Sequence, residues 1–398
     1  MQIAQRMQAI RVSGTIRLAN MARERAAAGL PIIDLAEGEP DFDTPSHVIE
    51  AAHRAALDGQ TRYTAVAGIA ELREAVAEKF RTENRFDCAA RQTIVGTGAK
   101  QLIFNALLAS LNPEDEAIIP APYWVSYPDI VKIAGGVPVT VQCDSPAFKL
   151  SPQALHKALT PRTRWLILNS PCNPTGAVYS EVELAALSDV LRTRPEVGVM
   201  CDDIYEKILY GSAVFATLGQ VAPDLADRIL TINGVSKSHA MTGWRIGFAT
   251  GPQDLIDAMI KLQGQSTTNA SSVAQAAALA ALTGPQEHVS DWCRAYSRRR
   301  SLVLSALESC PGLTASAPDG AFYVFANCAG ALGKAAPSGS VIETDIELSE
   351  FLLETAGVAI VPGTEFGYPG HQRLCFAKSD ENLTCALEAI REALCSLT

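Results

Sequence analysis

A single lysine and a single arginine stand among mostly small residues in the stretch NGVSKSHAMTGWRIGFAT, residues 233–250. Lys237 comes just after an apolar run, and Arg245 follows eight positions later. A lysine amine can bond covalently to a carbonyl compound, and an arginine guanidinium can bind a phosphate through paired hydrogen bonds. The small neighbours would let the backbone approach a ligand closely. The stretch therefore indicates a covalent amine site, and the competing interpretation is a lysine exposed on the surface.

Short runs with the composition of buried strands must position this lysine. They are QTIVGTG, DEAIIPAP, GVPVTVQC, TRWLILNSP, VGVMCDD, RILTINGVS and RIGFATGP. These runs alternate with longer patterns of helical periodicity, which predicts an α/β fold with a mostly parallel central sheet flanked by helices. Near-continuous apolar runs such as WLILN are typical of strands that are buried on both sides.

Two helices are marked by apolar residues at spacings of three and four. The first has an apolar face made of Ile69, Leu72, Val76 and Phe80. The second is long and amphipathic, and its apolar face is made of Val289, Trp292, Tyr296, Val303 and Leu307. We expect this second helix to carry the chain into another domain.

Beyond the long helix, three short apolar runs surround one helical pattern. The runs are GAFYVFAN, GVAIVPG and RLCFAK, and the helical pattern is TDIELSEFLLETAG. They predict a small α/β unit. Because 398 residues exceed one ordinary core, we expect a large domain over residues 45–290 and a smaller domain formed by residues 1–44 and 291–398.

Polar residues follow several of the expected strands, at the edge of an open α/β sheet where ligands bind. They are Gly98, Ala99 and Lys100 at the start of a helix, Asn173 in a turn, Asp202 with Tyr205, and Lys237. One crevice would then hold a helix amino terminus, an amide, a carboxylate, a phenol and an amine. Pyridoxal 5'-phosphate suits this set. Its aldehyde needs Lys237, its phosphate suits the helix terminus with Arg245, and its ring nitrogen needs an acid.

The chain resembles the class I (fold type I) pyridoxal-phosphate-dependent aminotransferases, and within them the bacterial aspartate aminotransferases. Residues 234–247 match that family's lysine signature, and further motifs match its other hallmarks in the right order: LAEGEPDFDTP, APYWVSYP, NSPCNPTGAVY, DDIYEKILY, VPGTEFG and RLCFAKSDENL. The resemblance extends from about Arg11 to Leu394. It implies a fold type I transferase with a mostly parallel central sheet flanked by helices and a smaller α/β domain.

The resemblance assigns roles around the cofactor. Asp202, rather than its neighbour Asp203, matches the carboxylate at the pyridine nitrogen. Asn173 and Tyr205 match the groups that hydrogen-bond the ring hydroxyl, and Trp124 matches the aromatic residue stacked on the ring. Without the resemblance, these residues would be read as strand-end caps, turn formers or core residues.

Tyr63 matches a residue that reaches the cofactor phosphate of the neighbouring subunit, which implies a homodimer with shared active sites. Its competing interpretation is a half-buried surface tyrosine. Ser236 is left out of the site, because Gly234 stands where some branches of the family have a phosphate-binding serine.

The resemblance also assigns the substrate contacts. Arg373 matches the arginine that binds the substrate α-carboxylate, and Gly38 lines the same pocket together with Trp124 and Asn173. For a second carboxylate, some branches use an arginine of the partner subunit, but the matching stretch QGQSTTNASSV has none. Lys100 occupies the place of a lysine that other branches use. Its competing interpretation is an exposed lysine in a first helical turn, where a cation is disfavoured.

The reaction implied is ping-pong transfer of an amino group from an L-amino acid, with aspartate expected, to a 2-oxo acid, with 2-oxoglutarate expected. Lys237 would act as the general base, and closure of the small domain over Arg373 would exclude water. The alternatives are an aminotransferase for aromatic, prephenate-type or neutral amino acids, a lyase or synthase of the same fold, and a ligand sensor without catalysis.

The composition of the chain argues against several other classes of function. The formal net charge of −10 opposes binding to nucleic acid, and we expect the RRR of residues 298–300 to lie on a solvated helix face. The ten cysteines include no C-x-x-C pair, so we expect neither a metal site nor disulfides. Reduced thiols are typical of the cytoplasm, and we therefore expect a cytoplasmic location. The amino terminus lacks a signal-peptide core and no apolar run has 18 residues, so we expect no membrane partner.

Overall fold

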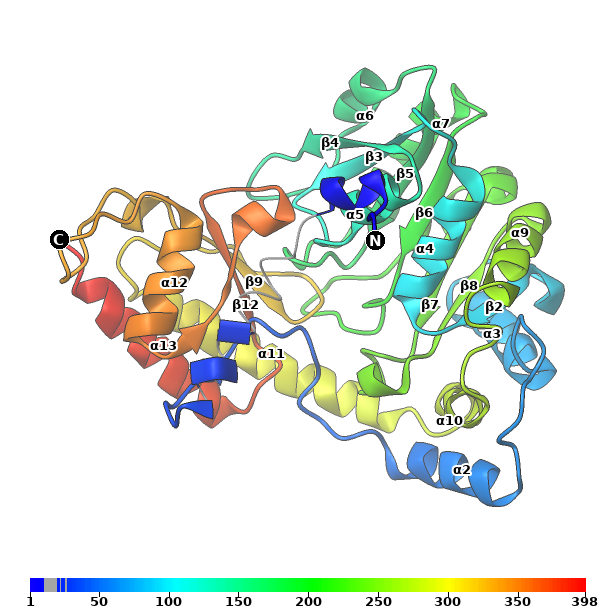
Figure 1. Ribbon diagram of the computed structural model, residues 1–398, viewed down its shortest axis with the longest axis horizontal. Helices are drawn as coiled ribbons and strands as arrows, with labels where there is room; N and C mark the ends of the chain where they lie inside the picture. Colours follow the sequence, from blue (N-terminus) through cyan, green and yellow to red (C-terminus); the bar gives the residue numbers. More distant parts are fainter. Residues whose placement is uncertain (11–19, 22, 26) are drawn as a thin grey trace.

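A seven-stranded sheet forms the centre of the protein in the computed structural model, which describes residues 1–10, 20, 21, 23–25 and 27–398 (Figure 1). In spatial order the strands are β4 (Val137–Gln142), β3 (Glu116–Ala121), β5 (Thr163–Asn169), β6 (Gly198–Asp202), β7 (Ile229–Gly234), β8 (Gly247–Thr250) and β2 (Thr93–Gly96). The pairs from β4 to β7 are parallel, and β8 is antiparallel to both neighbours. The prediction of a mostly parallel sheet is confirmed.

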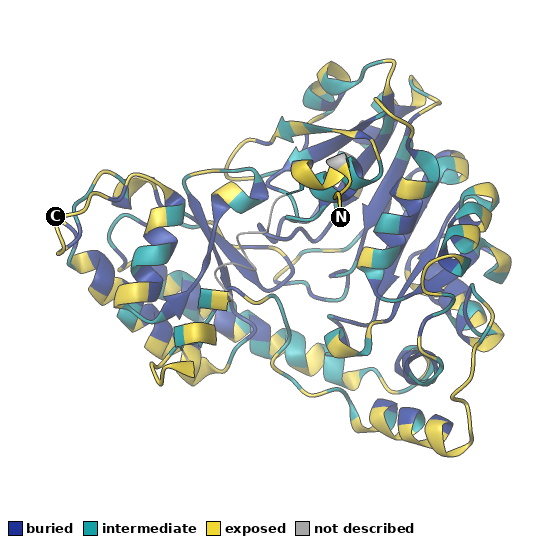
Figure 2. Cartoon of the chain, viewed as in Figure 1, coloured by how far each residue is buried: buried dark blue, intermediate teal, exposed yellow. Residues whose placement is uncertain are grey.

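Both faces of the sheet are covered by helices, because alternate residues of a strand point to opposite sides. In β5, Trp165 and Ile167 belong to one apolar core, whereas Leu166 and Leu168 belong to another. The first core includes residues of α4 (Ala99–Ser110), α5 (Tyr127–Ile133) and α9 (Gln253–Gly264). The second includes residues of α6 (Pro152–Ala158), α7 (Glu181–Arg192) and α8 (Leu218–Val221). Figure 2 shows the buried strands between helices whose outer faces are exposed.

A third core lies at the β2 and β8 edge of the sheet. It includes residues of α2 (Ser46–Leu57), α3 (Ala70–Glu83) and α10 (Ser272–Thr283). The predicted apolar face of α3 is confirmed for Leu72, Val76 and Phe80, which are buried, while Ile69 precedes the helix as its N-cap residue. Together these helices lie beside the strands from which the lysine segment emerges.

The predicted long helix is α11 (Glu287–Leu307), which leads from this side of the molecule into a fourth core (Figure 1). Tyr296, Val303 and Leu307 are buried there. The same core receives residues of β9 (Tyr323–Asn327), α12 (Asp345–Thr355), β12 (His371–Cys375) and α13 (Asp380–Cys395). The described residues also form short 3-10 helices: η1 (Gln5–Ala9), η2 (Ala90–Gln92), η3 (Pro223–Arg228), η4 (Thr242–Trp244), η5 (Ala329–Ala331) and η6 (Gly363–Phe366).

The run GVAIVPG forms two strands rather than one. Here β10 (Val358–Ala359) pairs with β1 (Ile33–Asp34) in parallel, and β11 (Val361–Pro362) pairs with β12 in the antiparallel sheet β11-β12-β9. The amino-terminal segment is thereby attached to the smaller α/β unit. The domain limits at residues 44 and 290 stay a prediction, and Arg11, where the resemblance begins, lies outside the described residues.

Candidate active site

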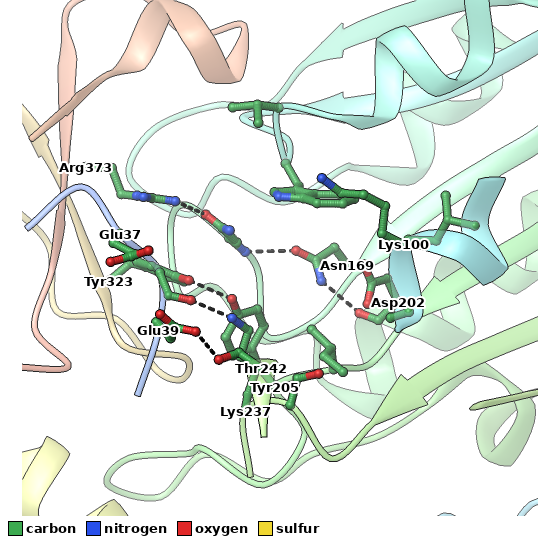
Figure 3. Close-up of a pocket in the computed structure, with 18 of the residues that line it drawn as sticks. Glu37, Glu39, Lys100, Asn169, Asp202, Tyr205, Lys237, Thr242, Tyr323 and Arg373 are labelled. Atoms are coloured by element: carbon green, nitrogen blue, oxygen red, sulfur yellow. Dashed lines mark hydrogen bonds between the residues drawn. The ribbon is translucent and has the colours of Figure 1, made fainter. Parts of the chain in front are cut away.

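A cavity of about 490 Å³ opens at the carboxyl ends of β5, β6 and β7 (Figure 3). All the sequence-predicted site residues line it except Gly98 and Tyr63: Gly38, Ala99, Lys100, Trp124, Asn173, Asp202, Tyr205, Lys237, Arg245 and Arg373. The strands therefore bring together side chains that are up to several hundred residues apart in the chain, as the strand-end rule predicts.

Lys237 lies three residues after the end of β7, within the cavity. Its Nζ donates a hydrogen bond of 2.5 Å to the carbonyl oxygen of Gly38, and it lies 5.8 Å from the ring centres of Tyr205 and Phe322. Burial among these groups lowers the pKa of the Lys237 amine to about 8. A larger share of the amine is therefore neutral at neutral pH, which is the form that attacks a carbonyl carbon or accepts a proton.

Asp202 is the last residue of β6 and lines the cavity. Its Oδ2 accepts a hydrogen bond of 2.6 Å from the Tyr127 hydroxyl, whereas its buried Oδ1 has no hydrogen-bond partner among the described residues. Burial raises the pKa of the Asp202 carboxyl to about 6. A buried oxygen of this kind is costly unless a donor reaches it, and the protonated nitrogen of a pyridine ring is such a donor.

Asp203, the neighbouring acid, does not line the cavity. Its Oδ2 accepts a hydrogen bond of 2.7 Å from the Thr217 hydroxyl, and burial raises its pKa. The geometry therefore favours Asp202 over Asp203 as the partner of a ligand.

The start of α4 lies against Arg245. Gly98, the N-cap residue, has a φ of +83°, and a side chain on it would collide with the Arg245 guanidinium. Arg245 itself has a left-handed backbone, with φ +57°, and its Nη1 donates a hydrogen bond of 2.8 Å to the carbonyl oxygen of Thr242. Free N–H groups at a helix amino terminus beside a guanidinium fit a phosphate, and only glycine at position 98 leaves the room.

Arg373 lies on β12 and is held in place from several sides. Its Nη1 donates a hydrogen bond of 3.0 Å to Asn173 Oδ1, and its Nη2 donates to the carbonyl oxygen of Ala36. The guanidinium also lies 4.6 Å from the ring centre of Tyr323 and 5.1 Å from that of Phe366. Its Nε is buried without a partner among the described residues. A guanidinium fixed in this way can bind a carboxylate with little loss of side-chain entropy.

Lys100 and Trp124 lie together on the cavity wall. The Lys100 amine is 4.7 Å from the centre of the Trp124 ring, a cation–π distance. Burial and the charge of Arg245 lower the pKa of Lys100. Tyr63, in contrast, is 88% exposed and does not contribute to the cavity of its own chain.

Sequence reasoning missed several residues that the fold places around the site. Asn169, the last residue of β5, donates a hydrogen bond of 2.8 Å to the Asp202 carbonyl oxygen and accepts one of 2.8 Å from the Asn173 N–H. The strand-end rule could have found it. The hydroxyls of Tyr323 and Tyr205 are 2.6 Å apart, and no local signal marks Tyr323 within its buried strand. Ser236, which the sequence analysis left out, also lines the cavity.

Three further observations concern metal ions, membranes and disulfides. Among the described residues, no group of three or more His, Cys, Asp or Glu side chains is arranged to hold a metal ion. Within the same part of the chain, no helix is long and apolar enough to cross a membrane. The ten cysteines are all free thiols.

The chain is similar in sequence to known proteins along most of its length. The model of the family described as aminotransferase class I and II matches residues 31–390. The aspartate/prephenate aminotransferase of Cereibacter sphaeroides is 51% identical over 388 residues, which cover 97% of each chain. An aspartate aminotransferase of Rhizobium meliloti is 48% identical over 393 residues, covering 98% of this chain and 96% of the relative.

Solved structures also resemble this chain, both in fold and in sequence. The crystal structure of the aspartate aminotransferase from Rhizobium meliloti superposes with a TM-score of 0.97 at 47% identity, covering 100% of both chains. The aspartate aminotransferase from Thermus thermophilus with maleate superposes with a TM-score of 0.91 at 44% identity, covering 99% of this chain and 100% of the other.

Proposed function

The chain belongs to the class I and II aminotransferases, and from this premise we propose that it uses pyridoxal 5'-phosphate to move the amino group of aspartate to 2-oxoglutarate. The observation that carries the proposal is the cavity itself. It combines an amine of lowered pKa at Lys237, a fixed guanidinium at Arg373, and a carboxylate oxygen of Asp202 that has no hydrogen-bond partner among the described residues. The names of the relatives support aspartate as the donor.

The residues of the cavity fit the cofactor in four places: its phosphate, its ring nitrogen, its ring hydroxyl and the face of its ring. The start of α4 and Arg245 would hold its phosphate, and Asp202 Oδ1 would accept the hydrogen bond from its ring nitrogen. Asn173 and Tyr205 are proposed to contact its ring hydroxyl, and Trp124 to stack on its ring. When bound, pyridoxal phosphate supplies an aldehyde that condenses with amines and a ring that withdraws electrons from the substrate Cα.

The side chains of the chain would then perform the proton transfers. Arg373 binds the α-carboxylate of the amino acid and so fixes its orientation. Lys237 Nζ would remove the proton from the substrate Cα and hold it for the transfer that completes the exchange of the amino group. The negative charge of Asp202 would stabilise a protonated ring nitrogen, and through it the charge that develops in the transition state. The first product leaves as a 2-oxo acid, and a second 2-oxo acid takes up the amino group by the reverse sequence.

Lys100 is the proposed receptor for the second carboxylate of aspartate and 2-oxoglutarate. Replacing Lys100 with alanine should raise the Michaelis constants of both by about 10–100-fold, since one charge-assisted hydrogen bond contributes about 1.5–3 kcal/mol. The Michaelis constant of a neutral donor such as alanine should barely change. Steady-state kinetics with the three substrates measure the difference.

Arg373→Ala is the matched comparison, because every amino acid has an α-carboxylate and all of them should bind more weakly. If wild type and Lys100→Ala have equal kinetics with aspartate, Lys100 does not bind the second carboxylate. A wild-type preference for phenylalanine over aspartate of tenfold or more would refute aspartate as the donor, while leaving the aminotransferase assignment in place.

A prephenate-type substrate is the second candidate, favoured by the names of relatives such as the Cereibacter sphaeroides protein. A screen of amino donors with 2-oxoglutarate and pyruvate, extended to prephenate as acceptor, separates the two candidates. A lyase or synthase of the same fold would instead release its product without consuming a 2-oxo acid.

A homodimer with shared sites is part of the proposal. The exposed ring of Tyr63 is free to enter the cavity of a second copy, where it would approach the phosphate. Sedimentation measures the assembly directly. We also propose a cytoplasmic location, which the free thiols support.

Tyr127→Phe should lower turnover by about tenfold, because the Asp202 carboxylate would lose a charge-assisted hydrogen bond. The hydrogen bond from Tyr127 holds down the pKa of Asp202, so the loss should be largest at low pH, where the carboxylate more readily takes up a proton. Turnover against pH checks this, with thermal unfolding as the control for folding. An unchanged pH profile would contradict the assignment.

A further inference from the structure

Glu37 lies between two residues that contact the reactive side chains. The carbonyl oxygen of Ala36 accepts a hydrogen bond from Arg373, and that of Gly38 accepts one from Lys237. Glu37 itself lines the cavity. In Figure 3 it lies on the side of the cavity that carries Arg373 and Tyr323, across from Lys100. A substrate whose α-carboxylate binds Arg373 and whose Cα lies near Lys237 would therefore lie close to the Glu37 side chain.

The backbone at Glu37 has little freedom to move away. Asp34 Oδ1 accepts hydrogen bonds from the N–H groups of Ala36, at 2.7 Å, and Glu37, at 3.1 Å. On the other side, Gly38 packs so closely that a side chain there would collide with the Tyr323 hydroxyl. The end of β1 and Tyr323 thus fix the backbone of Glu37 at the cavity wall.

The Glu37 carboxylate differs in its contacts from that of the nearby residue Glu39. Among the described residues, no hydrogen bond or ion pair reaches its oxygens, whereas Glu39 accepts a hydrogen bond from the Thr242 hydroxyl. The nearby cations have other contacts: Arg373 with Asn173, and Arg23 with Asn20. Within the part of the chain that the structure describes, an unpaired negative charge therefore lies at the cavity wall.

We propose that Glu37 is a specificity-determining residue that weakens the binding of amino acids and oxo acids with a second carboxylate, and so opposes the attraction of Lys100. The inference rests on the proposed aminotransferase function. Like charges repel, and a repulsive group discriminates among ligands as effectively as an attractive one. Because Glu37 is exposed, water screens the repulsion, and the effect is several-fold rather than many orders of magnitude.

Binding of maleate to the holoenzyme tests the inference, because this dicarboxylate has no amino group to transfer. Its dissociation constant is measured from the cofactor absorbance for wild type, Glu37→Gln and Glu37→Ala. The glutamine variant keeps the shape of the side chain and removes only the charge. Glu24→Gln is the matched control, since Glu24 is exposed in the same amino-terminal region but does not line the cavity.

Both Glu37 variants should bind maleate about three- to tenfold more tightly than wild type, and the ratio of the Michaelis constants for aspartate and alanine should fall by a similar factor. Glu24→Gln should match wild type. Unchanged or weaker binding of maleate in both Glu37 variants overturns the inference. If maleate binds more tightly but wild type does not transaminate aspartate, the proposed donor fails while the role of Glu37 stands.

Discussion

Lys237→Ala should lose turnover by more than about 10³-fold, because the amine that bonds the cofactor and the base that moves the substrate proton are removed together. The buried position of Lys237 and its lowered pKa suit both tasks. The purified wild-type protein should be yellow, and borohydride should attach the cofactor permanently to Lys237. Mass spectrometry of a proteolytic digest identifies the labelled lysine.

Lys261→Ala provides the control for this variant. Lys261 is exposed on α9, outside the cavity, and its loss should leave both turnover and labelling as in wild type. Label on any lysine other than Lys237 would show that the site is wrongly assigned.

Asp202→Asn should retain the cofactor and yet lower turnover by about 10²-fold or more, because a neutral amide cannot keep the ring nitrogen protonated. The change keeps the size of a buried side chain, so the fold should be preserved. Cofactor content is measured by absorbance and turnover by a coupled assay on the same samples.

Asp203→Asn separates the two neighbouring acids. Asp203 is bonded to Thr217 and faces away from the cavity, so its loss should affect thermal stability more than turnover. Near-normal turnover of Asp202→Asn combined with a large loss in Asp203→Asn would move the role to Asp203.

Much of the site could be predicted because each residue follows a recognisable strand. Asn173, Asp202 and Lys237 come after apolar runs whose composition marks buried parallel strands, and such strands all end at one edge of the sheet. The partners of these residues were harder to find. Tyr127 reaches Asp202 from α5, and Tyr323 reaches Tyr205 from a strand of the smaller unit.

The sequence by itself determined which segments are strands and helices and which edge of the sheet carries the chemistry, because apolar periodicity and strand-end residues are local properties of the chain. Only the tertiary structure decided that GVAIVPG contributes to two sheets, that one oxygen of Asp202 has no partner among the described residues, and that Glu37 lines the candidate cavity. These features depend on contacts between segments far apart in the chain. Such contacts are set by how whole elements pack, and the pattern of any single element does not contain them.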